Sequence, residues 1–345
     1  MNVAIVTSDR SVSLKGVAST IGRVLEREMG ASVKLVLSPV MSSSTYMGVD
    51  RVVVVMTFDP IWATPYFSLA WLLEYEGIRT LFYTTIEGRP RREVWHEWIY
   101  RDLSFVANSR YTARKLGEEG ARVLGVVHHG IFTEEVAAAR EMGRVVRREL
   151  GFGEEDVVVG YLAGGYVRKG HREFAEVIRI VGRKAPDVKF VVVTQPSAAS
   201  FYSGLDNCVV LDRFGGVERE WVYGFYHALD VYAHPALGEG FGLPVLEALA
   251  AGKPVVHADY EPLSEITTRE CSFRVRVTEV GTYSEGSGIR YELHFFDHSE
   301  FADAVIAAVD RVKRERDELA ARCVERANVF HARKKYKMLA KMLAK

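Results

Sequence analysis

Short runs of apolar residues alternate with longer amphipathic segments along most of this 345-residue chain. The runs are rich in valine and isoleucine, which is typical of buried parallel strands, and the segments between them have helical spacing. Regular alternation of strand and helix predicts an α/β fold, in which helices cover both faces of parallel sheets. The expected strands are residues 2–8, 32–38, 51–58, 79–88, 104–109, 122–130, 157–165, 189–195, 208–214, 230–236 and 254–258.

The alternation stops near residue 132, where the chain becomes charged and helical without a strand. A chain of this length usually exceeds one hydrophobic core, so we expect two domains. We predict a Rossmann-like domain over residues 1–135, a linker over 136–150 and a second Rossmann-like domain over 151–328. The basic, amphipathic segment 329–345 is expected to be a helix that packs back on the first domain or contacts a membrane surface.

Beyond Thr267, the pattern changes again. Residues 272–296 alternate around a centre rich in glycine and serine, which predicts a hairpin insert. A long charged segment from about Ser299 to Arg326 follows and is expected to be helical.

The composition excludes several classes of protein. The 45 basic and 45 acidic residues balance, so no overall field favours nucleic acid. Three widely spaced cysteines give neither a disulfide framework nor a zinc site. The start lacks the layout of a signal peptide, and no apolar run approaches the roughly 18 residues of a membrane helix. We expect a cytoplasmic protein, with a peripheral position at the inner membrane face as the alternative; the scarcity of glutamine and asparagine indicates a thermophile.

The stretch EGFGLPVLEALAAGKPVV, from Glu239 to Val256, combines glycines, two acids and a helix start. It follows an expected strand, at the carboxyl edge of the sheet where α/β proteins bind ligands. Glycines allow close approach to a ligand, and Pro244 suits a first helical turn, so we expect the helix to begin near Leu243. The free N–H groups of that turn form a site for phosphate or diphosphate.

The two acids of this stretch, Glu239 and Glu247, flank the expected phosphate site. Carboxylates beside a diphosphate are useful where they accept hydrogen bonds from neutral hydroxyls, which suggests a nucleotide sugar. The alternative is that they only stabilise a helix N-terminus electrostatically.

The spacing of these acids within the stretch resembles the motif of retaining GT-B glycosyltransferases of family 4, the glycosyltransferase group 1 signature. The resemblance implies a GT-B fold: two Rossmann-like domains that face each other across a cleft, the first for the acceptor and the second for the nucleotide-sugar donor. It implies that Glu239 lies against the donor sugar and that Glu247 binds the ribose hydroxyls. The amides expected on the diphosphate are those of Gly240, Phe241, Gly242 and Leu243.

The similarity extends to RKGHREF, which implies that Lys169 binds the diphosphate, and to the segment around Arg213 and Phe214, which are candidates for the nucleobase. Where the family usually has an arginine, this chain has Gly164. Arg168 either supplies the missing guanidinium or is a solvated charge.

Two further features of the family are altered in the first domain. The double glycine of its first loop is reduced to Gly16, which we expect just before the first helix and facing the donor phosphates. His128 and His129 replace the end of the domain and either pack between domains or touch ligand.

On the acceptor side, Glu87 follows an expected strand and is the first candidate to orient or deprotonate an acceptor hydroxyl. His96 is the second candidate, and both have alternative readings as ordinary surface or helix residues. Arg89 begins a basic cluster that either attracts an anionic acceptor or is a solvated loop. With Trp95 and Trp98 nearby, a basic and aromatic rim facing a membrane is a further hypothesis.

The resemblance implies a retaining hexosyltransferase that uses a nucleotide-diphosphate sugar as co-substrate and no other cofactor. No Asp-x-Asp sequence occurs, so we expect no metal site, and helix amides with Lys169 take over the metal's electrostatic role. The expected acceptor is a glycan, lipid or small molecule, and the catalytic candidates are Glu239, Glu87 and Lys169. The alternatives are a sugar-nucleotide epimerase or phosphorylase on the same fold, and a non-catalytic donor-binding protein.

Overall fold

The structure is a computed structural model that describes residues 1–94, 96–284 and 286–344. The chain divides into two compact units. The first comprises residues 1–132, 282–292 and 330–345, and the second comprises 133–281 and 293–329.

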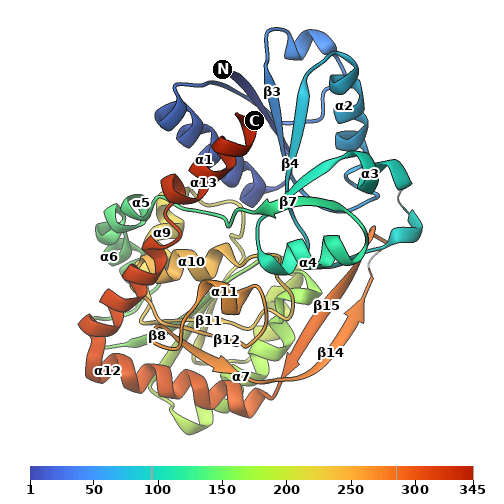
Figure 1. The fold of residues 1–345 in the computed structure, drawn as a ribbon. Coiled ribbons are helices and arrows are strands. Elements are labelled where there is room, and N and C mark those ends of the chain that lie inside the picture. Colours follow the sequence, from blue (N-terminus) through green and yellow to red (C-terminus); the bar gives the residue numbers. More distant parts are fainter. Residues whose placement is uncertain (95, 285, 345) are drawn as a thin grey trace. The chain divides into compact units, whose positions relative to one another are not determined.

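The first unit contains a parallel sheet of six strands in the order β2-β1-β3-β4-β6-β7 (Figure 1). The valines of its central strand are fully buried because helices cover both faces. The core of this unit contains a cluster of phenylalanine rings that pack at tilted or edge-on angles to one another: Phe58, Phe67, Phe82 and Phe105. The strands are β1 Asn2–Thr7, β2 Ser32–Val36, β3 Arg51–Thr57, β4 Arg79–Thr85, β6 Ser104–Ala107 and β7 Arg122–Val126.

The helices of the first unit include one from the far end of the chain. Helix α13, Ala332–Leu343, packs against α1, Val12–Met29, and buries Tyr336, Leu339 and Leu343 (Figure 1). The other helical segments are η1 Ser43–Tyr46, α2 Thr64–Tyr75, η2 Arg92–Val94, α3 Glu97–Asp102 and α4 Arg110–Glu118.

The second unit also contains a parallel sheet of six strands, in the order β10-β9-β8-β11-β12-β13. Its inner strands are buried along most of their length. The strands are β8 Val157–Leu162, β9 Val188–Val193, β10 Cys208–Leu211, β11 Val231–His234, β12 Val255–Ala258 and β13 Ser272–Val275. Both units therefore have the α/β, Rossmann-like arrangement expected from the alternating pattern.

Helices surround the second sheet and include the segment expected to be a linker. Residues 136–150 are mostly helical, as expected, in α5 and α6. They belong to the second unit rather than linking the two units, and α6 packs on α9. The helical segments are α5 Thr133–Ala138, α6 Arg140–Glu149, η3 Val167–Lys169, α7 His171–Lys184, α8 Pro196–Ala199, η4 Ser200–Tyr202, α9 Arg219–Ala228, α10 Leu243–Ala250, α11 Leu263–Ile266 and α12 His298–Asn328.

A third, three-stranded sheet has the order β14-β15-β5. It combines strands β14 Val277–Tyr283 and β15 Ile289–Phe296 with β5 Gly88–Pro90, which pairs antiparallel with β15. The end of this hairpin, residues 282–292, belongs to the first unit although both flanking segments belong to the second. Gly88 permits the pairing, because a Cβ at that position would lie 2.1 Å from the carbonyl oxygen of Arg290.

Over the described ranges, the helices all lack the combination of length and apolar character required to cross a bilayer.

Candidate functional site

The loop after β11 leads to the helix start singled out in the sequence. Helix α10 begins at Leu243, the expected position, and Pro244 occupies its first turn. Gly242 caps the helix with φ 100° and ψ 51°, a left-handed conformation that favours glycine. A Cβ at Gly242 would also lie 2.6 Å from Cδ2 of Leu263. Conformation and space both require glycine here.

The first turn of α10 leaves N–H groups available. Within the described part of the chain, the N–H groups of Gly242 and Leu243 have no acceptor, and that of Val245 donates to the carbonyl of Gly242 at 3.0 Å. Free N–H groups at a helix start attract anions. The arrangement can therefore receive a phosphate group, as the glycine pattern predicts.

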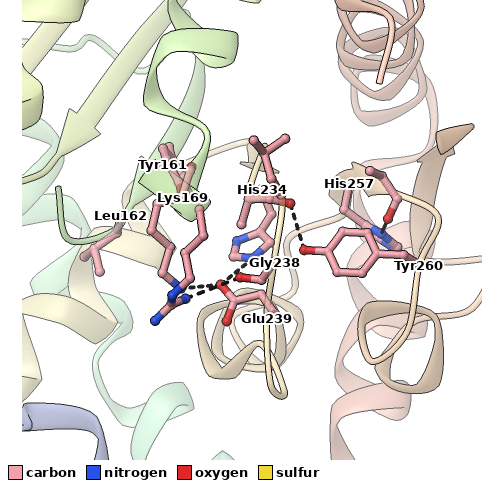
Figure 2. Close-up of polar contacts among 12 residues, drawn as sticks. Tyr161, Leu162, Lys169, His234, Gly238, Glu239, His257 and Tyr260 are labelled. Carbon is pink, nitrogen blue, oxygen red and sulfur yellow. Dashed lines mark hydrogen bonds and ion pairs between the residues drawn. The ribbon is translucent and has the colours of Figure 1, made fainter. Parts of the chain in front are cut away.

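Glu239 lies in this loop, buried, with its carboxylate against two basic side chains from other segments. Oε1 accepts a hydrogen bond from the ammonium of Lys169, and Nε2 of His234 lies 3.2 Å from the same oxygen. The exposed fractions of the Lys169 and Glu239 side chains are only 13% and 8%. Figure 2 shows the Lys169 and Glu239 side chains pointing toward one another. The structure thus brings together Glu239 and Lys169, which the sequence places 70 residues apart.

Burial and charge act in opposite directions on these groups. Burial raises the pKa of Glu239, but the charges of Lys169 and Arg168 and the contact with His234 outweigh it and hold that pKa well below its ordinary value. Burial lowers the pKa of His234 although the nearby carboxylate opposes the shift. At neutral pH, the site therefore holds an ionised carboxylate, an ammonium and a neutral imidazole.

Backbone contacts fix Lys169 beside the loop. The carbonyl of Arg168 accepts hydrogen bonds from the N–H groups of Leu237 and Gly238, at 2.8 and 3.2 Å. The next glycine, Gly170, lies so close to the loop that a Cβ there would be 2.1 Å from the carbonyl oxygen of Pro235. The Lys-Gly pair of the sequence is thus explained by the close approach of two loops, which places the Lys169 ammonium on Glu239.

Arg168 and Gly164 show how the chain departs from the usual family pattern. Nη1 of Arg168 donates to the carbonyl of Gly238 at 3.3 Å, on the loop that carries Glu239. At Gly164, a Cβ would meet the ring of Tyr166 at 2.9 Å and the ring of Phe214 at 3.2 Å. A side chain at position 164 would meet these two rings, and whether Arg168 takes the role of the family's arginine stays a prediction.

Glu247, the second acid, lies inside α10 and is 3% exposed. Its Oε1 forms an ion pair with Nη2 of Arg219 from α9. The Glu247 carboxylate raises the pKa of Arg219, and burial together with that carboxylate raises the pKa of Tyr223. Sequence reasoning missed Arg219, because no motif links α9 to this acid.

The candidates for the nucleobase have partners within the second unit. Nη1 of Arg213 donates to Glu149 at 2.7 Å, and the indole N–H of Trp221 donates to the other oxygen of that carboxylate at 3.1 Å. The N–H of Phe214 donates to the carbonyl of Thr194 at 3.1 Å. The ion pair is about half exposed, so exchange of Arg213 to another partner costs little.

A brace supports the Glu239 loop from β15. The N–H and Nδ1 of His294 lie 2.7 and 3.0 Å from the carbonyl oxygen of Leu237. The ring of His294 stacks on Tyr260 with centroids 4.2 Å apart, and the hydroxyl of Tyr260 donates to the carbonyl of Ala236 at 2.7 Å. Figure 2 shows Tyr260 reaching the loop on the side away from Lys169.

In the first unit, Gly16 requires a correction. Helix α1 begins at Val12, and the hydroxyl of Ser11 accepts the N–H of Leu14 as its cap. Gly16 is therefore inside the helix rather than just before it, and its amide is not part of the exposed first turn. Ser11 was the available signal, because serine is a preferred N-cap residue.

The other altered position of the first unit lies in a buried network. Nδ1 of His129 lies 2.8 Å from the hydroxyl of Tyr83, and Nε2 lies 3.1 Å from the amide nitrogen of Asn108. Burial lowers the pKa of His129 to about 3, so this ring is neutral and has a packing role within the unit. The neighbouring His128 contacts the ring of Phe330 edge-on.

The acceptor candidates lie around β5. Glu87 is half-buried, and its carbonyl accepts the N–H of Glu292 at 3.2 Å. Arg89 forms ion pairs with Glu292 at 3.1 Å and Glu118 at 3.3 Å, and Glu292 also pairs with Lys115. These contacts, with the bond to Glu292 first, raise the pKa of Arg89. The guanidinium of Arg89 is thus already engaged by carboxylates.

The expected basic and aromatic rim is only partly described. His96 is exposed at the start of α3, whereas Trp98 packs against the core. The guanidinium of Arg92 lies over the ring of Tyr100, 4.8 Å from its centroid. Trp95 lies outside the described residues. Arg92 belongs to a short 3-10 turn over Arg92–Val94, and helix α3 carries Trp98 and Tyr100.

Possible metal-binding side chains are the last feature of the site. Across residues 1–94, 96–284 and 286–344, no group of three or more histidine, cysteine, aspartate or glutamate side chains is placed to hold a metal ion.

The second unit carries a family signature. Residues 156–311 match the family described as glycosyl transferases group 1, and they include Lys169, Glu239 and Glu247. Residues 156–311 are a glycosyl transferases group 1 domain.

Relatives of this glycosyltransferase domain extend over both units. The chain is 28% identical over 342 residues to uncharacterized glycosyltransferase 335 of Sulfolobus islandicus rod-shaped virus 1, covering 97% of this chain and 98% of the relative. A glycosyltransferase from Rickettsia africae has a TM-score of 0.75 at 13% identity, covering 100% of this chain and 98% of the other. Anabaena HepE, solved with UDP and glucose, has a TM-score of 0.71 at 14% identity, covering 100% and 99%. The fold is the GT-B fold, as expected from the sequence.

Proposed function

We propose that the protein is a retaining, metal-independent glycosyltransferase that transfers a hexose from a nucleotide-diphosphate sugar to a hydroxyl group of a glycan, lipid or small molecule. One observation carries the proposal. An ionised, buried Glu239 paired with Lys169 lies beside the free first-turn amides of α10. This arrangement offers an anion site and a hydroxyl acceptor side by side.

In this proposal, the donor diphosphate binds over the first turn of α10. The N–H groups of Gly242 and Leu243 donate to phosphate oxygens, with Gly240 and Phe241 lining the same loop. The Lys169 ammonium turns from Glu239 to the diphosphate and neutralises the charge that develops on the leaving group. Its amine is already almost fully desolvated, so the exchange of partners requires little further burial.

The two acids recognise hydroxyls on either side of the diphosphate. Glu239, released by Lys169, accepts hydrogen bonds from the donor sugar because it stays ionised in its buried position. Glu247 accepts from the ribose hydroxyls through Oε2, since Oε1 is engaged by Arg219. Support for a nucleotide-sugar donor comes from HepE, solved in complex with UDP-glucose.

Metal independence follows from the same chemistry. Lys169 and the helix amides supply positive charge where the leaving diphosphate would otherwise need a cation. We expect transfer in excess chelator to proceed at the rate measured with Mg²⁺, and the product to keep the anomeric configuration of the donor in an NMR assay. A requirement for a divalent cation, or inversion, would contradict this part of the proposal.

The donor site is tested by thermal shift with UDP, GDP, ADP and their sugars. A ligand at about 100 times its dissociation constant adds roughly 2.7 kcal/mol of stability. We expect one nucleotide series to stabilise the wild type, and Lys169→Met and Glu247→Gln to weaken its binding at least tenfold. Lys184→Met is the matched control, because this lysine is 43% exposed and pairs only with Asp303 and Ser299 in the described residues. Unchanged affinity in both site variants would refute the donor-site assignment.

Catalysis needs a separate test, because binding without turnover describes a non-catalytic relative. We propose Glu87 as the group that orients or deprotonates the acceptor hydroxyl, and His96 as the competing candidate. With the donor identified, we expect Glu87→Gln to lower kcat at unchanged donor affinity, and His96→Gln to leave kcat within a factor of two. The reverse result assigns the role to His96, and epimerised or phosphorolysed donor without transfer would exclude a transferase.

A further inference from the structure

A second charged region lies at the opposite edge of the second sheet. Asp230 directly precedes β11 and Lys253 precedes β12, so both lie at the amino edge of these parallel strands, whereas Glu239 follows the carboxyl edge. A cavity of about 470 Å³ opens here between α6, α12 and the turn before β12. Its cationic side chains are Arg140, Arg144, Arg147, Lys253 and Arg316, and its acidic ones are Asp230 and Asp317.

Both carboxylate oxygens of the buried Asp230 have partners within the protein. Oδ2 of Asp230 accepts the N–H of Val158 at 2.9 Å and lies 3.3 Å from Arg147, and Oδ1 accepts Nη1 of Arg316 at 2.7 Å. Arg147 also donates to the backbone carbonyls of Gly153 and Ala228, at 3.0 and 2.6 Å. Asp230 and Arg147 therefore form a satisfied structural pair.

Two cations of the cavity lack such partners. Among the residues that the structure describes, no hydrogen bond or ion pair reaches the side chains of Lys253 or Arg140. Burial lowers the pKa of Lys253 to about 8, and Arg316, Arg147 and Arg140 add to the shift while Asp230 opposes it. The half-buried Lys253 ammonium thus faces several cations, which costs free energy unless an anion is bound, whereas Arg140 is exposed and Arg316 is more than half exposed.

The other charged and titratable groups of the cavity lining do not cancel the excess of positive charge. Arg144 pairs with Glu141 on its own helix at 2.9 Å. Nε2 of His227 lies 2.7 Å from the carbonyl of Val136, and burial lowers the pKa of this ring to about 4, so it adds no charge at neutral pH. Asp317 is exposed and, among the residues that the structure describes, is the only acid of the cavity lining that forms no ion pair.

We propose that this cavity is a second ligand site, which binds a phosphate or diphosphate group through Lys253, Arg140 and Arg316. A dianion matches several converging cations better than a single carboxylate does, and arginine donates to two phosphate oxygens at once. The site is separate from the donor site, since no residue of the Glu239 loop lines it.

The surroundings indicate that the phosphate belongs to a larger molecule. A second cavity of about 790 Å³ shares Arg140, His227, Gly252 and Ala320 with the first and continues along α12. Beyond the shared residues, its wall contains the apolar side chains of Ala137, Ala250, Ala321 and Val324 and the acids Glu134 and Glu325. The remainder of the ligand would extend along this wall.

The test uses the full chain with inorganic pyrophosphate as the probe, measured by calorimetry. Because the donor site also attracts diphosphate, binding is measured in Lys169→Met and in Lys169→Met/Lys253→Met. We expect the first variant to retain one site and the second to bind at least tenfold more weakly. Lys169→Met/Lys184→Met is the matched control and should bind as Lys169→Met does. Equal affinity in all three variants would overturn the proposal.

A second measurement protects the test against misfolded variants. Amine acylation of the wild-type protein, read by mass spectrometry at each lysine, reports whether Lys253 is covered. We expect pyrophosphate to slow acylation of Lys253 at least threefold and to leave Lys184 unchanged. Equal acylation of Lys253 with and without pyrophosphate would likewise overturn the proposal.

Discussion

The two charged regions of the second unit lie at opposite edges of one sheet and solve the burial of charge differently. Around Glu239, the ammonium of Lys169 balances the carboxylate charge, and the pKa of Glu239 is held low. Around Lys253, the available carboxylate is used by arginines, and the lysine pKa falls toward neutrality. A balanced cluster is stable in itself and must exchange partners to bind a ligand, whereas an unbalanced one gains stability when a ligand arrives.

The largest expected effect comes from removing one lysine from each region. Lys169→Met leaves Glu239 buried without its main partner, and we expect the free energy of unfolding to fall by about 3 kcal/mol. Lys253→Met removes an unbalanced cation, so we expect no loss of stability. Urea unfolding of both variants checks the comparison. Equal destabilisation would show that the two regions do not differ in charge balance.

Acid should destabilise the Glu239 region. Native Glu239 stays ionised to lower pH than in the unfolded chain, where its pKa is near 4.5, so the unfolded chain binds more protons as the pH falls. The lowered pKa of His234 acts in the same sense below pH 6.5. Each group contributes a loss of up to about 1.4 kcal/mol per pH unit. Urea unfolding between pH 7 and pH 3 measures this slope, and Glu239→Gln should flatten it below pH 5.

The two glycines at the ends of α10 give a smaller contrast. Gly242 and Gly252 both have positive φ, 100° and 78°. A Cβ at Gly242 would also collide with Leu263, whereas at Gly252 it would approach Ala320 only to 3.2 Å. We expect Gly242→Ala to cost about 2 kcal/mol and Gly252→Ala about 1 kcal/mol. Melting temperatures test the order, and a larger cost at Gly252 would mean that the Glu239 loop adapts more easily than its geometry indicates.

A further contrast is expected on the alkaline side. Because the pKa of native Lys253 is about 8 and that of an unfolded lysine about 10.5, the native protein releases this proton first. The unfolded chain then binds more protons between these values, so this group makes stability rise with pH there. Chemical unfolding at pH 7.5 and 9.5 should show a rise that Lys253→Met lacks. The same rise in the variant would assign it to other groups.

The sequence predicted the features that depend on local pattern. Buried strands follow from periodicity, and the helix start at Leu243 follows from glycine and proline placement. The family resemblance implied that Lys169 and Glu239 serve one donor, and the structure brings the two side chains together. The start of α1 was missed, although Ser11 offered a signal.

Other features depend on contacts that no local pattern encodes. Arg219 reaches Glu247 only because α9 and α10 are neighbours in the fold, and Arg213 pairs with Glu149 from α6. The pairing of β15 with β5 depends on register and on the space left by Gly88. The charge balance around Lys253 depends on which acids pair with the neighbouring arginines, and the spacing of basic residues in the sequence does not reveal those pairs.

The hairpin end, residues 282–292, and the terminal helix α13 affect how the two units can be recombined between related proteins. The chain passes from one unit to the other between residues 132 and 133, 281 and 282, 292 and 293, and 329 and 330. Consider a chimera that takes residues 1–132 from one parent and all later residues from a second parent. Its first unit would then contain residues 282–292 and 330–345 of the second parent. Such a graft should succeed only when residues 282–292 and 330–345 are kept from the same parent as residues 1–132, so the two units are inherited in five segments rather than two.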